Sequence, residues 1–226
     1  MNILKAAFFD LFFTLIIPKY DNYQNEYDVL DITPSEWELY AENDAIYHER
    51  ALGKISDKIE IIQKIASIMP FHVTEQQQRE ILIRRQNRMK SALMSVDKCI
   101  LDTLRLLHNK GIKLCLISNA DKIDCEFWNM SPLADIFDDA IFSCDAGFVK
   151  PDKKIYDYAA ERLKVAPNES IFIGDGGSDE LIGAKQAGML TVFTEYLDKK
   201  DEAKSQELRT DADYYIDNFG DLVDII

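Results

Sequence analysis

The sequence predicts an α/β protein whose core is a doubly wound parallel sheet, with an all-helical region inserted near the N-terminus. Three observations predict this fold. Short apolar runs alternate with helical patterns from residue 98 to the end of the chain. Residues 35–94 carry helical patterns and no strand signal. Finally, residues 4–9 are apolar except for Lys5, a pattern typical of a strand buried on both faces.

The N-terminal run, Met1 to Pro18, is expected to contain this first strand and not a signal peptide. Asp10 interrupts the run, and no small-residue cleavage pattern follows it. No other stretch approaches the roughly eighteen uninterrupted apolar residues that a membrane helix needs. Asp10 therefore falls at the C-terminal end of the strand, on the edge where open α/β sheets bind their ligands.

Three helices are predicted in the inserted region. Ser35 and Glu38 stand at capping-box spacing and open the first helix, which runs through His48. The second covers 56–69 and the third covers 74–94. We therefore expect an all-helical insert.

The rest of the chain alternates between helices and strands. Helices are expected at 98–109, 152–163, 179–187 and 219–226. Strands are expected at 112–117, 140–143, 170–173, 190–193 and 213–216. The charged stretch 195–211 is expected to be a solvated loop or a frayed helix.

Composition limits the classes of function. The chain has 226 residues, 26 Lys and Arg against 40 Asp and Glu, and a net charge of −14. This acidic balance argues against nucleic acid or an anionic membrane surface as the main partner. The four cysteines, at positions 99, 115, 125 and 144, show neither CxxC nor zinc-ligand spacing. We expect them to be reduced, in a cytoplasmic protein.

Polar residues follow three of the predicted strands. They are Asp10, the pair Ser118-Asn119, and Asp175. Because the ends of parallel strands share one edge, these segments should converge on one cleft, to which Lys150 adds a cation. A carboxylate, hydroxyl and amide donors, a lysine and an acidic loop suit attack by a carboxylate on an anionic electrophile, with a metal bound by the acids.

Four segments of the chain resemble, in order and spacing, the four motifs of the haloacid dehalogenase (HAD) superfamily. They are Phe8-Phe9-Asp10-Leu11-Phe12-Phe13-Thr14-Leu15, Leu116-Ile117-Ser118-Asn119, Lys150-Pro151-Asp152, and Ile173 to Glu180 followed by Gly183-Ala184 and Ala187-Gly188. The resemblance covers nearly the whole chain. It implies a Rossmann-like core over residues 1–17 and 95–226 and a type 1 helical cap over residues 18–94.

The resemblance also implies catalytic roles. Asp10 would be the nucleophile and form an aspartyl intermediate. Ser118, with Asn119 beside it, would hold the transferring phosphoryl group, and Lys150 would offset charge on nucleophile and substrate. Thr14 belongs to the first motif and is a further candidate for substrate contact.

A Mg²⁺ site is implied as well. Its ligands would be Asp10, the backbone carbonyl of Phe12, Asp175, and either Asp179 or Glu180. Alignment on Gly183-Ala184 favours Glu180 as the second acid.

Two cationic residues of the insert are candidates for substrate binding. Arg50 and Lys54 lie at a break between predicted helices, where caps of this type present a specificity loop. A solvated surface role for both stays open.

The sequence departs from the family pattern at Phe12, where most phosphatases of the family have a second Asp. That Asp protonates the leaving group and then activates the water that cleaves the intermediate. A phenyl ring can do neither, and loss of a general acid/base typically costs about 10²–10⁴-fold in rate. Phe13 stands where Gly is usual.

Three functions therefore stay open. The leading one is a Mg²⁺-dependent phosphatase that acts on a small phosphorylated metabolite and that is slow, is limited to good leaving groups, or takes its acid/base from elsewhere. The second is a metal-independent 2-haloacid dehalogenase, because a halide leaves without protonation, although Asp175-Gly176-Gly177 replaces the Ser-Ser-Asn of that subfamily. The third is a protein that binds a phosphorylated metabolite without turnover. The sequence predicts neither the metabolite nor the oligomeric state.

Overall fold

The centre of the molecule is a parallel sheet with strand order β3-β2-β1-β4-β5-β6. This computed structural model describes residues 4–20 and 24–226; residues 1–3 and 21–23, which the predicted core and cap include, lie outside the described residues. The strands are β1 Ala6–Phe9, β2 Lys113–Ser118, β3 Asp139–Phe142, β4 Ser170–Gly174, β5 Leu190–Thr194 and β6 Tyr214–Ile216. The predicted doubly wound sheet is confirmed.

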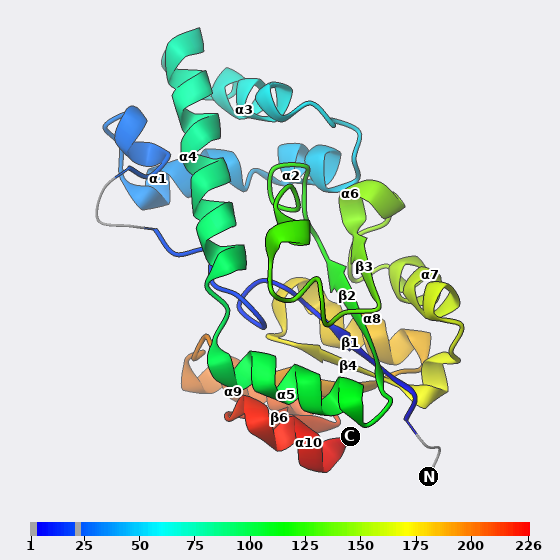
Figure 1. Ribbon diagram of the computed structural model, residues 1–226. Helices are drawn as coiled ribbons and strands as arrows, with labels where there is room; N and C mark the ends of the chain where they lie inside the picture. The colour runs from blue at the N-terminus through cyan, green and yellow to red at the C-terminus, as the bar shows by residue number, and fades with distance from the viewer. Residues whose placement is uncertain (1–3, 21–23) are drawn as a thin grey trace.

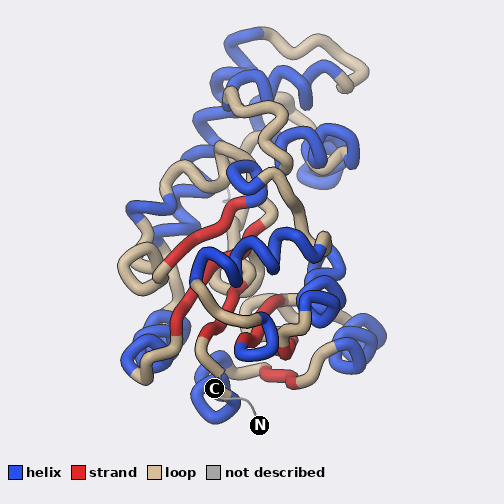
Figure 2. Tube along the Cα trace, turned by 90° about the vertical axis from the view of Figure 1, so that its right-hand side faces the viewer, coloured by secondary structure: helices blue, strands red, loops and turns tan. Residues whose placement is uncertain are grey.

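Alternate strand residues face two separate apolar layers. In β1, Ala7 and Phe9 join one core cluster, whereas Ala6 and Phe8 join the other. All four side chains are fully buried, which explains why the sequence shows a continuous apolar run there. Helices cover both faces of the sheet (Figure 2). They are α5 Lys98–Asn109 and α10 Leu222–Ile225 on the first face, and α7 Lys153–Leu163 and α8 Glu180–Ala187 on the second.

Four helices between β1 and α5 form the region that we call the helical insert. They are α1 Pro34–Ala41, α2 Asp44–Ala51, α3 Lys58–Ser67 and α4 Glu75–Met94. Figure 1 shows them gathered at one end of the molecule, above the sheet. They enclose a core of their own, which includes Trp37, Ile46, Ile61 and Ile65. The insert also packs closely on the sheet edge, because a Cβ on Gly53 would lie 2.1 Å from the Cys144 carbonyl oxygen.

The prediction of one helix from Ser35 to His48 is wrong, because two helices occupy this segment. The capping box is made by Thr33 and Glu36: Glu36 N donates to Thr33 Oγ1 at 3.2 Å, and Thr33 N donates to the Glu36 carboxylate at 2.8 Å. Pro34 decides this start, since proline suits the first helical position. The Asn43 side chain then caps α2. Thr74, the first residue predicted for the third helix, caps α4.

The remaining elements are short, apart from one helix in the charged stretch. The 3₁₀ helices are η1 Tyr27–Val29, η2 Trp128–Met130, η3 Pro167–Glu169, η4 Gly177–Asp179 and η5 Phe219–Asp221. α6 spans Ser143–Ala146, and α9 spans Glu202–Asp211, where a loop or frayed helix was expected. α9 is ordered because Asp201 caps it and Leu208 packs on the sheet.

Two further expectations concern the cysteines and membrane-spanning segments. The four cysteines are free thiols, as expected. In the described part of the chain, no helix has the length and apolar character required to span a membrane.

Candidate active site

The strand order places the switch point of the sheet at β1, where connections run outward in both directions. In such sheets, ligands bind in the crevice outside the carboxyl ends of the strands at this point. Asp10 follows β1 directly, and its N–H donates to the carbonyl of Ile173 in β4 at 2.9 Å. Asp175 follows β4 in turn. The two carboxylates therefore meet at the crevice.

Three buried carboxylates form a cluster there, which we call the acid cluster: Asp10, Asp175 and Glu180. Oxygen atoms of the three lie within 4.8 Å of one another. All three side chains are buried, whereas Asp179 is exposed and lies outside the cluster. Of the two acids that the sequence left open, the structure therefore brings Glu180 to the site.

Glycines of the loop after β4 allow Glu180 to fold back onto the cluster. A Cβ on Gly174 would lie 2.0 Å from Glu180 Oε1, so a larger residue would displace the carboxylate. Gly176 has a φ of 84°, in the left-handed region that favours glycine, and its N–H donates to the same oxygen at 3.1 Å. The glycine-rich motif thus shapes the site through its backbone.

Lys150 bridges two members of the acid cluster. Its Nζ contacts Asp10 Oδ1 and lies 2.5 Å from Glu180 Oε2. Burial alone would lower the pKa of Lys150, but the negative charges of Asp10 and Glu180 outweigh it and raise that pKa. This lysine therefore stays charged beside the predicted nucleophile.

The acid cluster carries more negative charge than the lysine offsets. Burial raises the pKa of Asp10 despite the charge of Lys150, and Asp175 adds to the rise. Burial also raises the pKa of Glu180, and the Asp10 charge reinforces it. Hard carboxylate oxygens that converge in a buried site are the donors that Mg²⁺ prefers. The donor set therefore fits a divalent cation.

A second lysine, Lys200, was missed by the sequence analysis. Its Nζ lies 2.7 Å from Asp175 Oδ2 and 2.6 Å from Asp198 Oδ2. The Lys200 N–H donates to the buried carboxylate of Glu195 at 3.0 Å, which fixes the loop. No signal distinguished this residue from other lysines of the charged stretch.

Two hydroxyl groups at this edge lack protein partners. Thr14 Oγ1 and Ser118 Oγ are buried, and neither forms a hydrogen bond with any part of the chain that the structure describes. Buried polar atoms are nearly always paired, so two unpaired donors indicate a place for a ligand. Both residues are sequence-predicted substrate contacts, and Ser118 ends β2, the neighbour of β1.

Asn119 has a positioning contact that the sequence analysis did not predict. Lys150 N donates to Asn119 Oδ1 at 2.8 Å, and Asn119 Nδ2 donates to the Lys150 carbonyl at 3.1 Å. The Asn119 amide therefore holds the segment that carries Lys150. Its direct contact with substrate stays a prediction, as does the metal-binding role of the Phe12 carbonyl.

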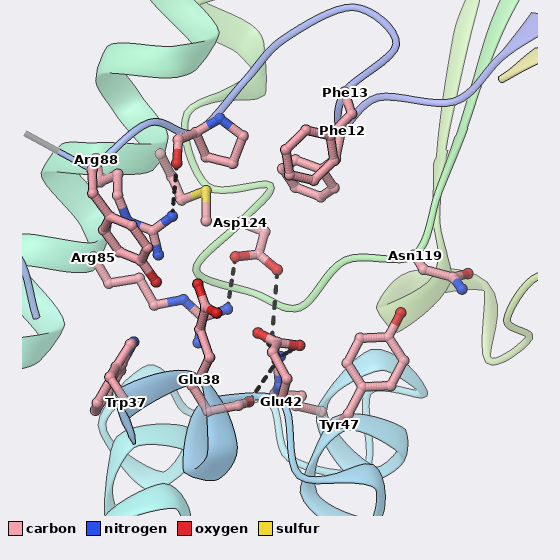
Figure 3. Close-up of a pocket in the computed structure, with 15 residues that line it drawn as sticks. Phe12, Phe13, Trp37, Glu38, Glu42, Tyr47, Arg85, Arg88, Asn119 and Asp124 are labelled. Atoms are coloured by element: carbon pink, nitrogen blue, oxygen red, sulfur yellow. Dashed lines mark hydrogen bonds and ion pairs between the residues drawn. The ribbon is translucent and has the colours of Figure 1, made fainter. Parts of the chain in front are cut away.

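A cavity of about 300 Å³ lies between the helical insert and the sheet edge (Figure 3). Phe12 and Phe13 form one wall, and residues of α1 and α2 face them across it. Phe13 has a φ of 63°, in the left-handed region that a bulky side chain rarely adopts. The other lining residues are Pro18, Tyr20, Trp37, Glu38, Ala41, Glu42, Tyr47, Arg50, Arg85, Arg88, Met89, Asn119 and Asp124.

The two basic candidates of the insert have different surroundings. Lys54 is exposed and is not among the described residues that line the cavity, so the structure does not bring it to the site. The Arg50 side chain is only 3% exposed, which overturns the solvated reading. It donates to Asp121 at 2.7 Å and to Glu42 at 2.9 Å, and its Nε has no partner among the described residues.

Arg50 belongs to a buried ion-pair group that joins the insert to the loop after β2. We call the four residues Arg50, Arg85, Asp121 and Asp124 the Arg–Asp group. Arg85 Nη2 lies 2.8 Å from both Asp121 Oδ2 and Asp124 Oδ1. The other α4 arginines pair with glutamates, for example Arg88 with Glu26. The basic character of α4 therefore serves mainly to bind acidic neighbours.

Replacing Asp121 with Asn is expected to lower the free energy of unfolding by about 3–5 kcal/mol at pH 7, because it removes the one carboxylate that both buried arginines contact at 2.7–2.8 Å. Burial alone would raise the pKa of Asp121, but Arg85 and Arg50 hold it at about 2. The carboxylate titrates near pH 4 in an unfolded chain. Its stabilisation is therefore complete above pH 4 and is lost as the pH falls toward 2.

Denaturant unfolding of both proteins across this pH range checks this prediction. The stability gap between parent and Asp121→Asn should narrow below pH 4. A matched control is Asp157→Asn, which removes an exposed partner of Lys153 and should change stability by less than about 0.5 kcal/mol. A gap that stays constant down to pH 2 would contradict the role assigned to Asp121.

Fold and site together define an α/β protein with a candidate active site at the carboxyl edge of its sheet. The family model described as haloacid dehalogenase-like hydrolase matches residues 4–188, which contain all four motifs. The chain therefore belongs to this family of hydrolases.

Similar proteins of known name fall into more than one class. Over 107 residues, the chain is 35% identical to bifunctional epoxide hydrolase 2 of Rattus norvegicus; the match covers 45% of this chain and 19% of that protein. It is 29% identical over 133 residues to glyceraldehyde 3-phosphate phosphatase of Methanopyrus kandleri, covering 56% of this chain and 54% of the relative. The chain thus matches about half, or less, of the length of these relatives.

Solved structures share the fold. A HAD family enzyme of Bacteroides thetaiotaomicron, in complex with magnesium and inorganic phosphate, has a TM-score of 0.66 at 20% identity, covering 89% of this chain and 98% of that one. A 2-haloacid dehalogenase of Pseudomonas syringae pv. Tomato has a TM-score of 0.67 at 22% identity, covering 99% and 98%. At these identities the likeness concerns the fold alone.

Proposed function

We propose that this hydrolase is a Mg²⁺-dependent phosphatase that acts on a small phosphorylated metabolite through an aspartyl phosphate at Asp10. The observation that carries the proposal is the pair of buried, unpartnered hydroxyls of Thr14 and Ser118 at the edge that holds the acid cluster. Hydroxyl donors and a buried lysine suit the oxygens of a phosphoryl group. The phosphatase names of relatives such as that of Methanopyrus kandleri support the same class of substrate.

In the proposed reaction, a carboxylate oxygen of Asp10 attacks phosphorus, and the bond between phosphorus and the leaving oxygen breaks. Thr14 and Ser118 donate hydrogen bonds to the phosphoryl oxygens, and Lys150 offsets their charge. Water then attacks the phosphorus of the aspartyl phosphate, which releases phosphate and restores Asp10. Asp10, Asp175, Glu180 and the Phe12 carbonyl would hold Mg²⁺, which supplies further charge neutralisation at the phosphoryl group when bound.

The helical insert is proposed to act as a cap over this site. Residues 18–94 would form the cap, and residues 1–17 and 95–226 the core. The cavity beneath the insert, of about 300 Å³, suits a small leaving group. Its lining of aromatic rings and ion-paired side chains suits a metabolite with both apolar and polar parts, and closure of the cap would exclude water.

A panel of phosphoesters, assayed with and without Mg²⁺ alongside a halide-release assay on 2-haloacids, tests the proposal. We expect Mg²⁺-dependent release of phosphate and no release of halide. Metal-independent halide release would establish the dehalogenase alternative instead. If no substrate turns over while phosphate ligands raise the melting temperature, the chain is a binding protein.

Ser118→Ala is expected to lower kcat/KM for phosphoesters by about 10–100-fold, since a hydrogen bond to a charged group contributes about 1.5–3 kcal/mol. Because the Ser118 hydroxyl lacks a partner in the protein, the variant should be as stable as the parent or more so. Activity and thermal unfolding are measured together.

The matched control for this variant is Ser170→Ala, at the start of β4 and far from the carboxyl edge. Ser170 Oγ donates to the Ala166 carbonyl at 3.0 Å, so its loss should cost stability and leave kcat/KM unchanged. A Ser118→Ala variant with full activity and reduced stability would contradict the assignment of its hydroxyl to the phosphoryl group.

A further inference from the structure

The proposed reaction leaves one proton without a donor. When the leaving oxygen departs it needs a proton, and Phe12 stands where the family has an acid for this purpose. A replacement has to reach the cavity beneath the helical insert, which Phe12 and Asn119 line. The candidates are the side chains of this cavity that carry an available proton.

Most acidic or hydroxyl side chains of the cavity wall are already engaged or lie away from the nucleophile. Glu42 and Asp124 are ion-paired with the arginines of the Arg–Asp group. Tyr20 packs under the Arg88 guanidinium at 4.5 Å, and Figure 3 shows Arg88 and Asn119 at opposite ends of the cavity. Glu38 is exposed to solvent. Tyr47 remains.

Tyr47 reaches the catalytic end of the cavity from α2. Its ring stands next to Asn119 in the close-up view, with the hydroxyl directed away from the insert (Figure 3). The Asn119 side chain and the Lys150 charge both act to lower the pKa of Tyr47 against the effect of its burial. Because Asn119 holds the Lys150 backbone and Lys150 contacts Asp10, this chain of contacts ends at the nucleophile.

The surroundings of Tyr47 fix the ring and keep its hydroxyl protonated. The Arg50 guanidinium lies 5.1 Å from the ring centroid, and the His48 ring packs against it edge to face at 5.9 Å. Burial raises the pKa of Tyr47, so the phenol is protonated at neutral pH. The nearby Lys150 charge favours the phenolate that forms when the proton leaves.

We propose that Tyr47 is the catalytic residue that protonates the leaving group, in place of the acid that Phe12 lacks; this inference rests on the proposed phosphatase function. As the bond between phosphorus and the leaving oxygen breaks, its electron pair moves to that oxygen, which takes the Tyr47 proton. The phenolate regains a proton from solvent before the next cycle. A residue of the helical insert thus completes the active site only when the insert covers it.

The test compares Tyr47→Phe with the parent on two substrates. Glycerol phosphate has a basic leaving oxygen that needs a proton, whereas the p-nitrophenolate of p-nitrophenyl phosphate departs without one. Tyr47→Phe should lose about 10²–10⁴-fold in kcat/KM, which reports the first step, on glycerol phosphate; this is the usual contribution of a general acid. On p-nitrophenyl phosphate it should lose only a few-fold. Tyr40→Phe, which alters a tyrosine packed against the core of the insert, is the matched control and should change neither rate.

Two further measurements separate catalysis from structure. In a Phe12→Asp background, Tyr47→Phe should cost far less on glycerol phosphate, because the new carboxyl supplies the proton. An equal loss on both substrates, or no loss on either, would overturn the role of Tyr47. If p-nitrophenyl phosphate turnover survives Asp10→Asn, the proposed function itself fails, independently of Tyr47.

Discussion

Asp10→Asn is expected to abolish phosphatase turnover, with kcat lower by about 10⁴-fold or more, as when other enzymes lose their nucleophile. An amide oxygen is a poor nucleophile, and the substitution also removes the carboxylate that Lys150 contacts. The fold should persist, because Lys150 keeps its contact with Glu180 at 2.5 Å and one of three crowded negative charges disappears. Steady-state kinetics and thermal unfolding of the same preparation check both expectations.

The matched control is Asp179→Asn, which neutralises an acid of the same loop outside the acid cluster. It should leave turnover and the Mg²⁺ requirement close to those of the parent. Substantial turnover in Asp10→Asn would remove the nucleophile from the mechanism. If Asp179→Asn needs a much higher Mg²⁺ concentration for turnover than the parent does, Asp179 and not Glu180 is the second acidic metal ligand.

Phe12→Asp is expected to speed hydrolysis of the aspartyl phosphate by about 10²–10⁴-fold, the usual contribution of a general base. Tyr47 can donate a proton to the leaving group, but a phenol that is protonated at neutral pH is a weak base toward the attacking water. The Phe12 side chain is partly exposed, lines the cavity and packs only at the margin of the core, so a shorter carboxylate can take its place. Single-turnover kinetics separate this step from the first.

Phe12→Asn is the control for this gain, because it has the size of Asp and no titratable group. It should show no faster hydrolysis. If Phe12→Asp folds, binds Mg²⁺ and is no faster than the parent, the slow step does not depend on a base at this position.

The parts of the molecule that sequence predicts best are those set by local pattern. The strands were predictable because burial on both faces leaves continuous apolar runs, as in β1 and β4. The site was predictable from the topology of the sheet. Asp10, Ser118 and Asp175 each lie at the end of a parallel strand, and the ends of parallel strands share one edge. The start of α1 was mispredicted because two overlapping segments, from Thr33 and from Ser35, both fit the capping pattern.

Contacts between distant segments could not be predicted. Arg50 and Asp121 are 71 positions apart, and their ion pair depends on how the insert packs on the loop after β2. Lys200 reaches Asp175 only because buried Glu195 fixes its loop. The position of Tyr47 beside Asn119 likewise follows from the placement of α2, which no local periodicity encodes.

Acid quenching during turnover, followed by mass spectrometry of the peptide that contains Asp10, tests the central claim most directly. Because Phe12 offers no base for the second step, the aspartyl phosphate should accumulate in the parent protein. We expect a phosphoryl group on Asp10 in the parent, a smaller amount in Phe12→Asp, and none in Asp10→Asn. Rapid phosphate release by a parent protein whose Asp10 peptide never carries a phosphoryl group would contradict the account.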